Sequence, residues 1–316
     1  MNIAYSCDER YIQHTGISMI SLFENNKDAQ EINIYFIAKN VSEKSINQLQ
    51  NIVNDYNRKL IVIPFAKLCS KLNNVHIGRH IETIYAKVFF GNIQNVDKIF
   101  YLDSDTIICD SLLPLWEKNM DGFYFGCVKT ITKDPCKALG ISERDDFFND
   151  GVALINTKAL REGKMEDKFL RYIADYDGNP PFLSEGTINV VCKGKILPIE
   201  PKYNLLSGFL MFKNDDLRKV ARQQSDFYSD KELNSAKNSP VVIHYLTGWY
   251  KRPWEEGCSH PLREYYHKYK AKSPWSEQPL IYRSIPFKIR LLKVVFNNLP
   301  IRFVLFIRRV FVMFTA

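Results

Sequence analysis

The stretch that decides the fold is Lys98-Ile99-Phe100-Tyr101-Leu102-Asp103-Ser104-Asp105-Thr106-Ile107-Ile108. Its apolar, aromatic run lacks proline and glycine, which predicts a buried parallel strand that ends in two carboxylates. Because open α/β sheets bind ligands at the carboxyl ends of their strands, we expect Asp103 and Asp105 at that edge. Alternate side chains of an extended segment share one side, so both carboxylates can reach one Mg²⁺ or Mn²⁺ whose other ligands are diphosphate oxygens. Ser104 then turns toward a sugar or a neighbouring strand. Asp-x-Asp is also common where an aspartate merely caps the next helix.

The rest of the chain alternates strand-like and helix-like segments. Strands are predicted at residues 2–7, 32–38, 60–64, 123–129, 152–156, 195–199 and 241–245, and helices at 12–25, 42–56, 83–90, 158–176 and 185–192. Residues 201–240 are weakly periodic and predict loops and short helices. This rhythm is typical of a Rossmann-like, mostly parallel sheet flanked by helices. We predict one α/β domain over residues 1–265 and a C-terminal tail over residues 266–316.

The positive charge of the chain is concentrated at its C-terminal end. The 316 residues carry a net charge of +8 and are 46% hydrophobic, enough for a large core. Residues 281–316 contain seven basic residues and no acidic one, so residues 1–280 carry only +1 of the +8. A nearly neutral body offers no basic groove, which argues against a nucleic-acid partner.

The cysteines and the N-terminus indicate a reducing compartment. Seven cysteines are an odd number, no two form a Cys-x-x-Cys pair, and several lie in apolar runs. This pattern favours free buried thiols over disulfides or a zinc site. The N-terminus lacks the basic and apolar regions of a signal peptide, so we expect a cytoplasmic protein.

Two loops after predicted strands carry residues suited to a nucleotide. Asp8 and Tyr11 follow the first strand, where a tyrosine can stack on a base and a carboxylate can accept from a pyrimidine N–H. The same residues can instead cap and pack the first turn of the next helix. No Gly-x-Gly-x-x-Gly or P-loop motif occurs.

His244 ends the last strand and could add the nitrogen ligand that favours Mn²⁺, although a histidine at a strand end is more often structural. Beyond it, Gly248 would let the backbone approach a phosphate that Lys251 or Arg252 would neutralise.

Two further segments place polar groups beside the sheet. Phe147-Phe148-Asn149-Asp150-Gly151-Val152 sets an amide and a carboxylate between aromatics and a strand, or forms a plain Asn-Asp-Gly turn. Glu185 lies at a predicted helix start, where the helix dipole favours an acidic residue in any case.

In their order along the chain, these pieces resemble glycosyltransferase family 8, a retaining, metal-dependent family. The resemblance covers most of residues 2–256. The matching elements are the first strand with Asp8 and Tyr11, Tyr85-Ala86-Lys87, Tyr101-Leu102-Asp103-Ser104-Asp105, Phe148-Asn149-Asp150-Gly151-Val152, the helix start Ser184–Asn189 and the segment His244–Trp254.

The resemblance implies a GT-A fold and transfer of galactose or glucose from a UDP-sugar to a saccharide or lipid-linked acceptor. It assigns Asp103, Asp105 and His244 as ligands of Mn²⁺ (or Mg²⁺). It assigns Asp8 and Tyr11 to binding of uridine, Lys87, Ser104 and Asn149 to binding of the donor, and Gly248 with Lys251 to binding of the phosphates. The catalytic residues that it implies are Asn149, Asp150 and Glu185. This chain departs from the family pattern in three places. The family usually has arginine where Lys87 stands and an Asp-Gln pair where Ser184-Glu185 stands. After His244, this chain has one extra residue before Gly248 and another before Pro253. Glu185 is therefore expected near the anomeric carbon, as a nucleophile or an electrostatic stabiliser.

The basic tail predicts contact with an anionic membrane surface. Residues 287–299 and 301–314 are predicted to form two amphipathic segments hinged at Pro300. Their uninterrupted apolar runs are far shorter than the ~20 residues of a membrane span. Basic residues between aromatic and aliphatic ones fit a helix lying in an anionic leaflet, at the inner face of the membrane. The alternative is a C-terminal helix packed on the body.

Two other functions remain open from the residues. A phosphohydrolase of the haloacid dehalogenase type also uses Asp-x-Asp at a strand end, but its motif comes early and a later acidic pair completes its metal site. A non-catalytic module that binds a sugar nucleotide is the second alternative, suggested by the Ser184-Glu185 departure.

Overall fold

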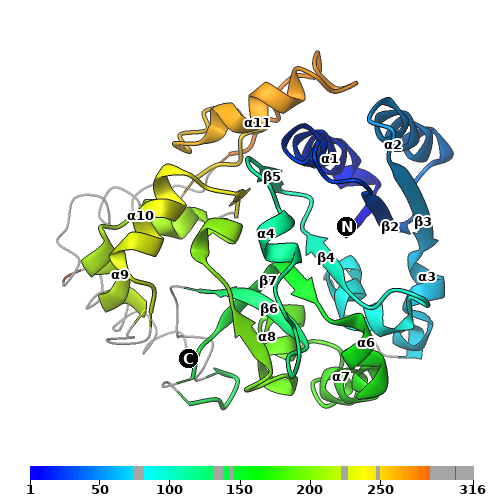
Figure 1. Cartoon of the computed structure of the whole chain (residues 1–316), viewed down its shortest axis with the longest axis vertical. Coiled ribbons are helices and arrows are strands. Elements are labelled where there is room, and N and C mark those ends of the chain that lie inside the picture. Colours follow the sequence, from blue (N-terminus) through cyan, green and yellow to red (C-terminus); the bar gives the residue numbers. More distant parts are fainter. Residues whose placement is uncertain are drawn as a thin grey trace.

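The main sheet has seven strands among the residues that the structure describes, in the order β3-β2-β1-β4-β7-β6-β8 (Figure 1). The structure is a computed structural model that describes residues 1–74, 82–130, 138–142, 145–221, 227–246, 250–284 and 303. The strands are β1 (Asn2–Asp8), β2 (Asn33–Lys39), β3 (Lys59–Pro64), β4 (Ile99–Leu102), β6 (Phe125–Lys129), β7 (Phe148–Ile155) and β8 (Ile196–Pro198). Only the two pairs made by β7, with β4 and β6, are antiparallel. The predicted mostly parallel sheet is confirmed.

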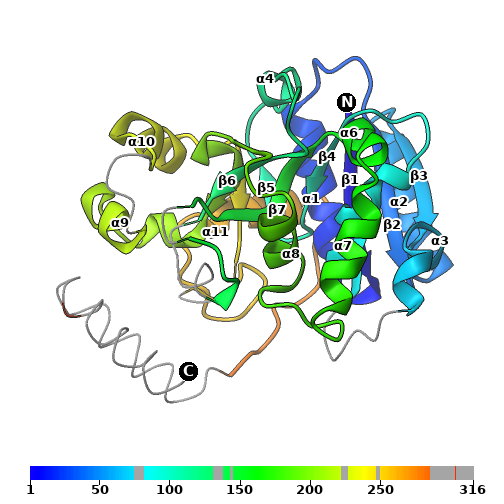
Figure 2. The same ribbon diagram turned by 90° about the horizontal axis from the view of Figure 1, so that it is seen from below.

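Helices cover both faces of this sheet (Figures 1 and 2). The α-helices are α1 (Ile12–Asn25), α2 (Glu43–Asp55), α3 (Phe65–Leu68), α4 (Leu113–Trp116), α6 (Thr157–Glu162), α7 (Met165–Ala174), α8 (Leu183–Val191), α9 (Asn214–Ala221), α10 (Asp230–Asn238) and α11 (Arg263–Lys270). The 3₁₀ helices are η1 (Glu9–Tyr11), η2 (Ser70–Asn74), η3 (Glu82–Asn92), η4 (Pro201–Asn204) and η5 (Ser207–Leu210). Helices α1, α2 and α11 belong to one apolar core, and α6, α7, α8 and η3 belong to the other.

The central strands are apolar throughout because both faces are buried. In β4, Phe100 and Leu102 pack into the core that contains α1, whereas Ile99 and Tyr101 pack into the core that contains α7. Successive side chains of a strand alternate between faces, so a strand covered by helices on both sides needs apolar residues at every position. This explains the unbroken apolar run that precedes Asp103.

A second, three-stranded sheet brings the distant His244 to the edge of the main sheet. Its order is β5-β10-β9, with β5 (Thr106–Ile108), β9 (Leu205–Leu206) and β10 (Val242–His244). Strand β10 is antiparallel to β5, and this register sets His244 opposite Thr106. The histidine therefore reaches the acidic pair through strand pairing across more than a hundred residues of sequence.

Two predicted helices differ in the structure. The segment 158–176 forms two helices, α6 and α7, because the chain turns at Gly163 and at Lys164, whose φ is +49°. The segment 83–90 lies in the 3₁₀ helix η3 rather than in an α-helix. By contrast, the polar start of the helix at 42–56 is a true cap, since Oγ of Ser42 accepts from the Ser45 N–H.

The compact core continues past the boundary expected at residue 265, which falls inside α11. Tyr266 and Tyr269 of α11 and Trp275 beyond it are buried against α1, where Gly16 leaves space for the Trp275 ring. Of the tail, residues 285–302 and 304–316 lie outside the described residues, so the two amphipathic segments stay predictions. Within the described ranges, every helix is too short or too polar to span a bilayer.

Candidate functional site

Two carboxylates and an imidazole meet where β4 ends. Asp103 follows β4 directly, Asp105 precedes β5, and His244 ends β10. One ligand atom of each residue lies within 4.8 Å of those of the others. Nε2 of His244 is 3.2 Å from Oδ1 of Asp105 and 3.7 Å from Oδ2 of Asp103. The predicted convergence of the three side chains is therefore observed.

The environment of His244 fits a divalent cation. Nε2 is buried between the two carboxylates and forms no hydrogen bond within the described part of the chain, while Nδ1 lies 3.0 Å from Oδ1 of Asn204. Burial alone would lower the pKa of His244, but Asp105 and Asp103 outweigh it and raise that pKa. Two carboxylates and one imidazole nitrogen suit Mn²⁺ or a similar ion. A cation at this point would satisfy the unpaired nitrogen and compete with the proton that the carboxylates favour.

Gly151 in β7 leaves the space that the acidic pair and the imidazole occupy. A Cβ atom at this position would overlap Oδ2 of Asp103 and Cε1 of His244. The backbone of the same residue also holds the site, since its carbonyl accepts from the Asp103 N–H at 2.7 Å. Any side chain here would overlap two of the three candidate ligands, so at least one of them would have to shift.

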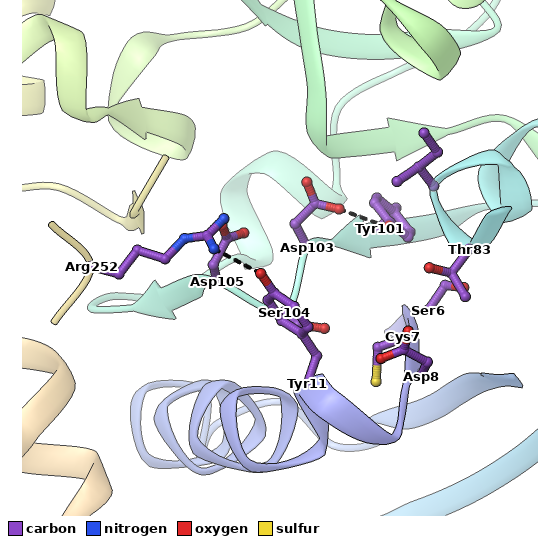
Figure 3. A pocket seen from close by; sticks show the side chains of 11 residues that line it. Ser6, Cys7, Asp8, Tyr11, Thr83, Tyr101, Asp103, Ser104, Asp105 and Arg252 are labelled. Atoms are coloured by element: carbon purple, nitrogen blue, oxygen red, sulfur yellow. Dashed lines mark hydrogen bonds and ion pairs between the residues drawn. The ribbon is translucent and has the colours of Figure 1, made fainter. Parts of the chain in front are cut away.

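A cavity of about 210 Å³ opens beside the acidic pair, at the carboxyl ends of β1 and β4 (Figure 3). Asp8 and Arg252 lie toward opposite ends of it, and Tyr11 also lines it. The Arg252 guanidinium donates to the Tyr11 hydroxyl at 2.7 Å and to Oδ2 of Asp105 at 3.2 Å. The cavity therefore joins an aromatic ring, an arginine and the acidic pair, which suits a ligand with a base at one end and an anionic group at the other.

Of Ser104, Lys251 and Gly248, which are predicted to bind the donor, only Ser104 is observed to line the cavity. Ser104 lines the cavity, but its Oγ accepts from the Thr15 hydroxyl of α1 at 2.8 Å. Nζ of Lys251 donates to the Glu256 carbonyl at 2.7 Å, away from the cavity. Gly248 lies outside the described residues. Of the two cations that the sequence left open, Arg252 is the one that faces the acidic pair.

Lys87 lies beneath the acidic pair, with 2% of its side chain exposed. Its Nζ is 3.0 Å from Oδ2 of Asp150 and 3.9 Å from Oδ1 of Asp103, and it sits over the Tyr101 ring. The Tyr101 hydroxyl donates to Oδ1 of Asp103, and Ser184 donates to Asp150, each at 2.7 Å. Because buried charges are stable only when paired, this network fixes Asp103. Contact of Lys87 with a donor stays a prediction.

Glu185 and Asn149 form the far side of the site. Nδ2 of Asn149 donates to Oε2 of Glu185 at 2.7 Å, and Oδ1 of Asn149 accepts from Nδ2 of Asn204 at 2.8 Å. Burial, together with repulsion from Asp150, raises the pKa of the Glu185 carboxyl to about 8, against the opposing effects of the Asn149 N–H and the Lys87 ammonium. The folded environment therefore favours the protonated form of Glu185.

Sequence reasoning missed two residues that shape the site. Asn204 contacts both His244 and Asn149, but it lies in a weakly periodic segment that carries no motif. The hydroxyl of Tyr101 holds Asp103, although its place in an apolar strand suggested only packing. The alternation of the strand is a usable signal for Tyr101, because it shares a face with Asp103.

The fold and the site together define an α/β protein with a candidate metal centre and an adjoining ligand cavity at the carboxyl edge of a mostly parallel sheet. The family description "Glycosyl transferase family 8" matches residues 2–258. The chain therefore belongs to glycosyltransferase family 8, which confirms the resemblance found in the sequence and argues against a phosphohydrolase.

Its relatives include bacterial transferases. The chain is 24% identical over 286 residues to lipopolysaccharide 1,2-glucosyltransferase of Escherichia coli (strain K12), covering 88% of this chain and 79% of the relative. It is 18% identical over 285 residues to general stress protein A of Bacillus subtilis (strain 168), covering 87% and 95%. Among solved structures, galactosyltransferase LgtC in complex with donor and acceptor sugar analogues superposes with a TM-score of 0.69 at 18% identity, covering 92% and 99%. An active-site mutant of LgtC superposes with a TM-score of 0.71 at 20% identity. The GT-A fold is confirmed by these likenesses.

Proposed function

We propose that this glycosyltransferase moves galactose or glucose from a UDP-sugar to a hydroxyl of a saccharide or lipid-linked acceptor, with retention of configuration, in cell-surface glycan synthesis. The observation that carries the proposal is the meeting of Asp103, Asp105 and His244 beside the cavity lined by Asp8 and Tyr11. The relationship to lipopolysaccharide glycosyltransferases supports the acceptor class.

The residues divide into a nucleotide side and a sugar side. Asp103, Asp105 and His244 would hold Mn²⁺ (or Mg²⁺), which when bound neutralises charge on the diphosphate. Tyr11 stacks on or brackets the uridine, with Asp8 at the same end of the cavity. Arg252 is close enough to turn from Asp105 toward a diphosphate oxygen, where its planar fork suits phosphate.

On the sugar side, Glu185 faces the anomeric carbon. As a nucleophile it would form a bond to that carbon as UDP leaves. The acceptor hydroxyl would then displace the carboxylate and pass its proton to a phosphate oxygen of the UDP that has left. As a stabiliser it would offset the positive charge of an oxocarbenium-like transition state. Asn149 donates a hydrogen bond to Glu185 and so favours the ionised carboxylate that either role needs. Asp150 forms an ion pair with the buried Lys87.

Hydrolysis of UDP-glucose and UDP-galactose, with and without Mn²⁺, tests the proposed function. Mn²⁺-dependent release of UDP is the expected result, and the better donor identifies the sugar. Release of inorganic phosphate would indicate a phosphohydrolase. Binding of UDP-sugar without turnover, even with saccharide acceptors added, would indicate a binding module.

Glu185→Gln is expected to lower the rate of UDP release about a hundredfold or more, because the amide cannot carry the negative charge that the sugar side needs. Full activity of this variant would remove Glu185 from both proposed roles. Glu43→Gln, in the exposed first turn of α2, is the matched control that should keep wild-type turnover.

The same variant gives a second readout in metal-free protein. Since the folded state holds the pKa of Glu185 near 8, the stability that its protonated form contributes is complete below the ordinary pKa and is lost as pH rises through about 8. The non-ionising Gln variant should therefore gain several degrees in Tm relative to wild type between pH 5 and pH 9. An unchanged Tm difference over this range would contradict the assignment of a protonated carboxyl.

We further propose that the enzyme is cytoplasmic and binds the inner membrane face through its tail. Deleting residues 285–316 spares the Arg283–Glu255 ion pair and is expected to reduce sedimentation with anionic vesicles at least tenfold, at about 1 kcal/mol per basic residue. A full-length variant with glutamine at the six basic positions of this segment should show the same loss. Equal sedimentation of all three proteins, or equal binding to neutral vesicles, would contradict electrostatic attachment. The positions are Lys288, Arg290, Lys293, Arg302, Arg308 and Arg309.

A further inference from the structure

We propose that Asn204 is a positioning residue that fixes the tautomer of His244 and leaves Nε2 of that ring free to bind a cation. The value of this tautomer rests on the proposed function, but the hydrogen bonds that set it do not. They form a chain in the buried interior: Gly151 N–H to Asn149, Asn204 to Asn149, and His244 to Asn204. Asn204 and His244 have no exposed surface, and Asn149 is 6% exposed.

The direction of each bond in this chain follows from its fixed end. The Gly151 backbone N–H can only donate, and it lies 3.2 Å from the Asn149 amide, so the atom facing it is the oxygen. The nitrogen of Asn149 then faces Glu185, whose carboxylate accepts. Because that same Asn149 oxygen lies 2.8 Å from the Asn204 amide, Asn204 must present its nitrogen there.

The orientation of Asn204 decides the proton on His244. With its nitrogen turned to Asn149, Asn204 has only its carbonyl oxygen to offer Nδ1 of the imidazole, at 3.0 Å. A carbonyl oxygen can only accept, so Nδ1 must carry the hydrogen. The opposite tautomer could donate from Nε2 to Asp105, but it would set Nδ1 and the Asn204 oxygen against each other as two buried acceptors.

This arrangement prepares the far nitrogen for a metal. In the neutral ring with hydrogen on Nδ1, Nε2 keeps its lone pair, and it is this atom that lies 3.2 Å from Asp105 and 3.7 Å from Asp103. A histidine that binds a metal through one nitrogen is oriented by the bond that its other nitrogen donates. The Asn149 amide thus contacts both the metal-ligand side and the Glu185 side of the site. Its oxygen accepts from Asn204 and so orients that residue, and its nitrogen donates to Glu185.

Two variants separate this role from simple packing. Asn204→Leu keeps the approximate volume but offers Nδ1 no acceptor. Asn204→Asp keeps an acceptor for Nδ1, although it replaces the donor to Asn149 with a charged oxygen. Asn26→Leu is the control, since Asn26 is also a buried asparagine and bonds Leu22 and Leu112 far from the site.

The first measurement is ¹⁵N NMR of the His244 ring in metal-free protein, in alkaline buffer where the ring is neutral. Wild type and Asn204→Asp are expected to show hydrogen on Nδ1, and Asn204→Leu a mixture with hydrogen on Nε2, which can then bond Asp105. Hydrogen on Nε2 in wild type, or an unchanged tautomer in Asn204→Leu, would overturn the proposal.

The second measurement is Mn²⁺ binding without donor. Asn204→Leu is expected to weaken it about 10- to 100-fold, while Asn204→Asp and Asn26→Leu stay within about threefold of wild type. If Asn204→Asp lost as much affinity as Asn204→Leu, the role would be packing alone and the proposal would fail. A wild-type protein that binds no Mn²⁺ but shows the predicted tautomer dependence would overturn the proposed metal site and leave the role of Asn204 standing.

Discussion

Asp105→Asn is expected to reduce Mn²⁺-dependent release of UDP about a thousandfold, the largest effect among the variants considered. The carboxylate lies 3.2 Å from Nε2 of His244 and 3.2 Å from Arg252, so it sits at the centre of the candidate metal site. A Lewis-acid cation contributes several kcal/mol to stabilising transition-state charge, and each 1.4 kcal/mol is about tenfold in rate. The amide of asparagine has nearly the same shape as the carboxylate, but its neutral oxygen binds a divalent ion much more weakly.

A folding defect can be distinguished from this loss. Burial alone would raise the pKa of Asp105, but His244 and Arg252 outweigh it and lower that pKa, so the side chain is a buried anion. Because this anion pairs with Arg252 at 3.2 Å, its replacement is expected to lower Tm, so turnover is compared at a temperature where both proteins are folded. Asp110→Asn, an exposed change just after β5, is the matched control. Turnover of Asp105→Asn within a few-fold of wild type, in folded protein, would exclude Asp105 as a metal ligand.

Gly151→Ala is expected to give the second largest effect, about a hundredfold loss of UDP release, without removing any polar group. The added methyl would overlap both Asp103 and His244, so at least one candidate ligand must shift. Small displacements of a metal ligand or a reacting group carry costs of this size even where the fold survives. Mn²⁺ affinity and turnover should fall together.

The control for this variant is Gly126→Ala in the adjacent strand β6. A Cβ there would meet Ile199 at 3.4 Å and Met120 at 3.5 Å, which are ordinary contacts. Both variants add one methyl group to a buried strand, so they differ mainly in what that methyl touches. Equal Mn²⁺ affinity in the two variants would show that the space above Gly151 is not needed by the site.

The parts of the site that the sequence predicts are those set by local periodicity. The apolar run into Asp103 requires a strand buried on both faces, and the alternation of that strand sets Asp103 and Asp105 near each other. The place of His244 at a strand end made it a candidate ligand, and the family resemblance strengthened that hypothesis. Its position beside the acidic pair depends on the pairing of β10 with β5 rather than on any local pattern.

The parts that escaped prediction depend on long-range packing. Asn204 lies in a segment without periodicity and gains its role from Asn149 and His244, which are distant in sequence. The choice between Lys251 and Arg252 could not be made from the sequence, because neighbouring residues in a loop point to different sides and only the fold decides which side faces Asp105. The split of the helix at 158–176 depends on a left-handed turn at Lys164, a residue that rarely signals one.

Asp103, Asp105 and His244 are proposed to hold one Mn²⁺ that binds the diphosphate of UDP. The most direct test is a titration with Mn²⁺, followed by electron paramagnetic resonance, with and without UDP. Wild type should bind one Mn²⁺ per chain, and UDP should bind more tightly when the ion is present. A variant with Asp103, Asp105 and His244 all replaced by alanine should lose both the ion and the gain in UDP affinity. If that variant bound Mn²⁺ and UDP as wild type does, the ion would lie elsewhere and the account would be wrong.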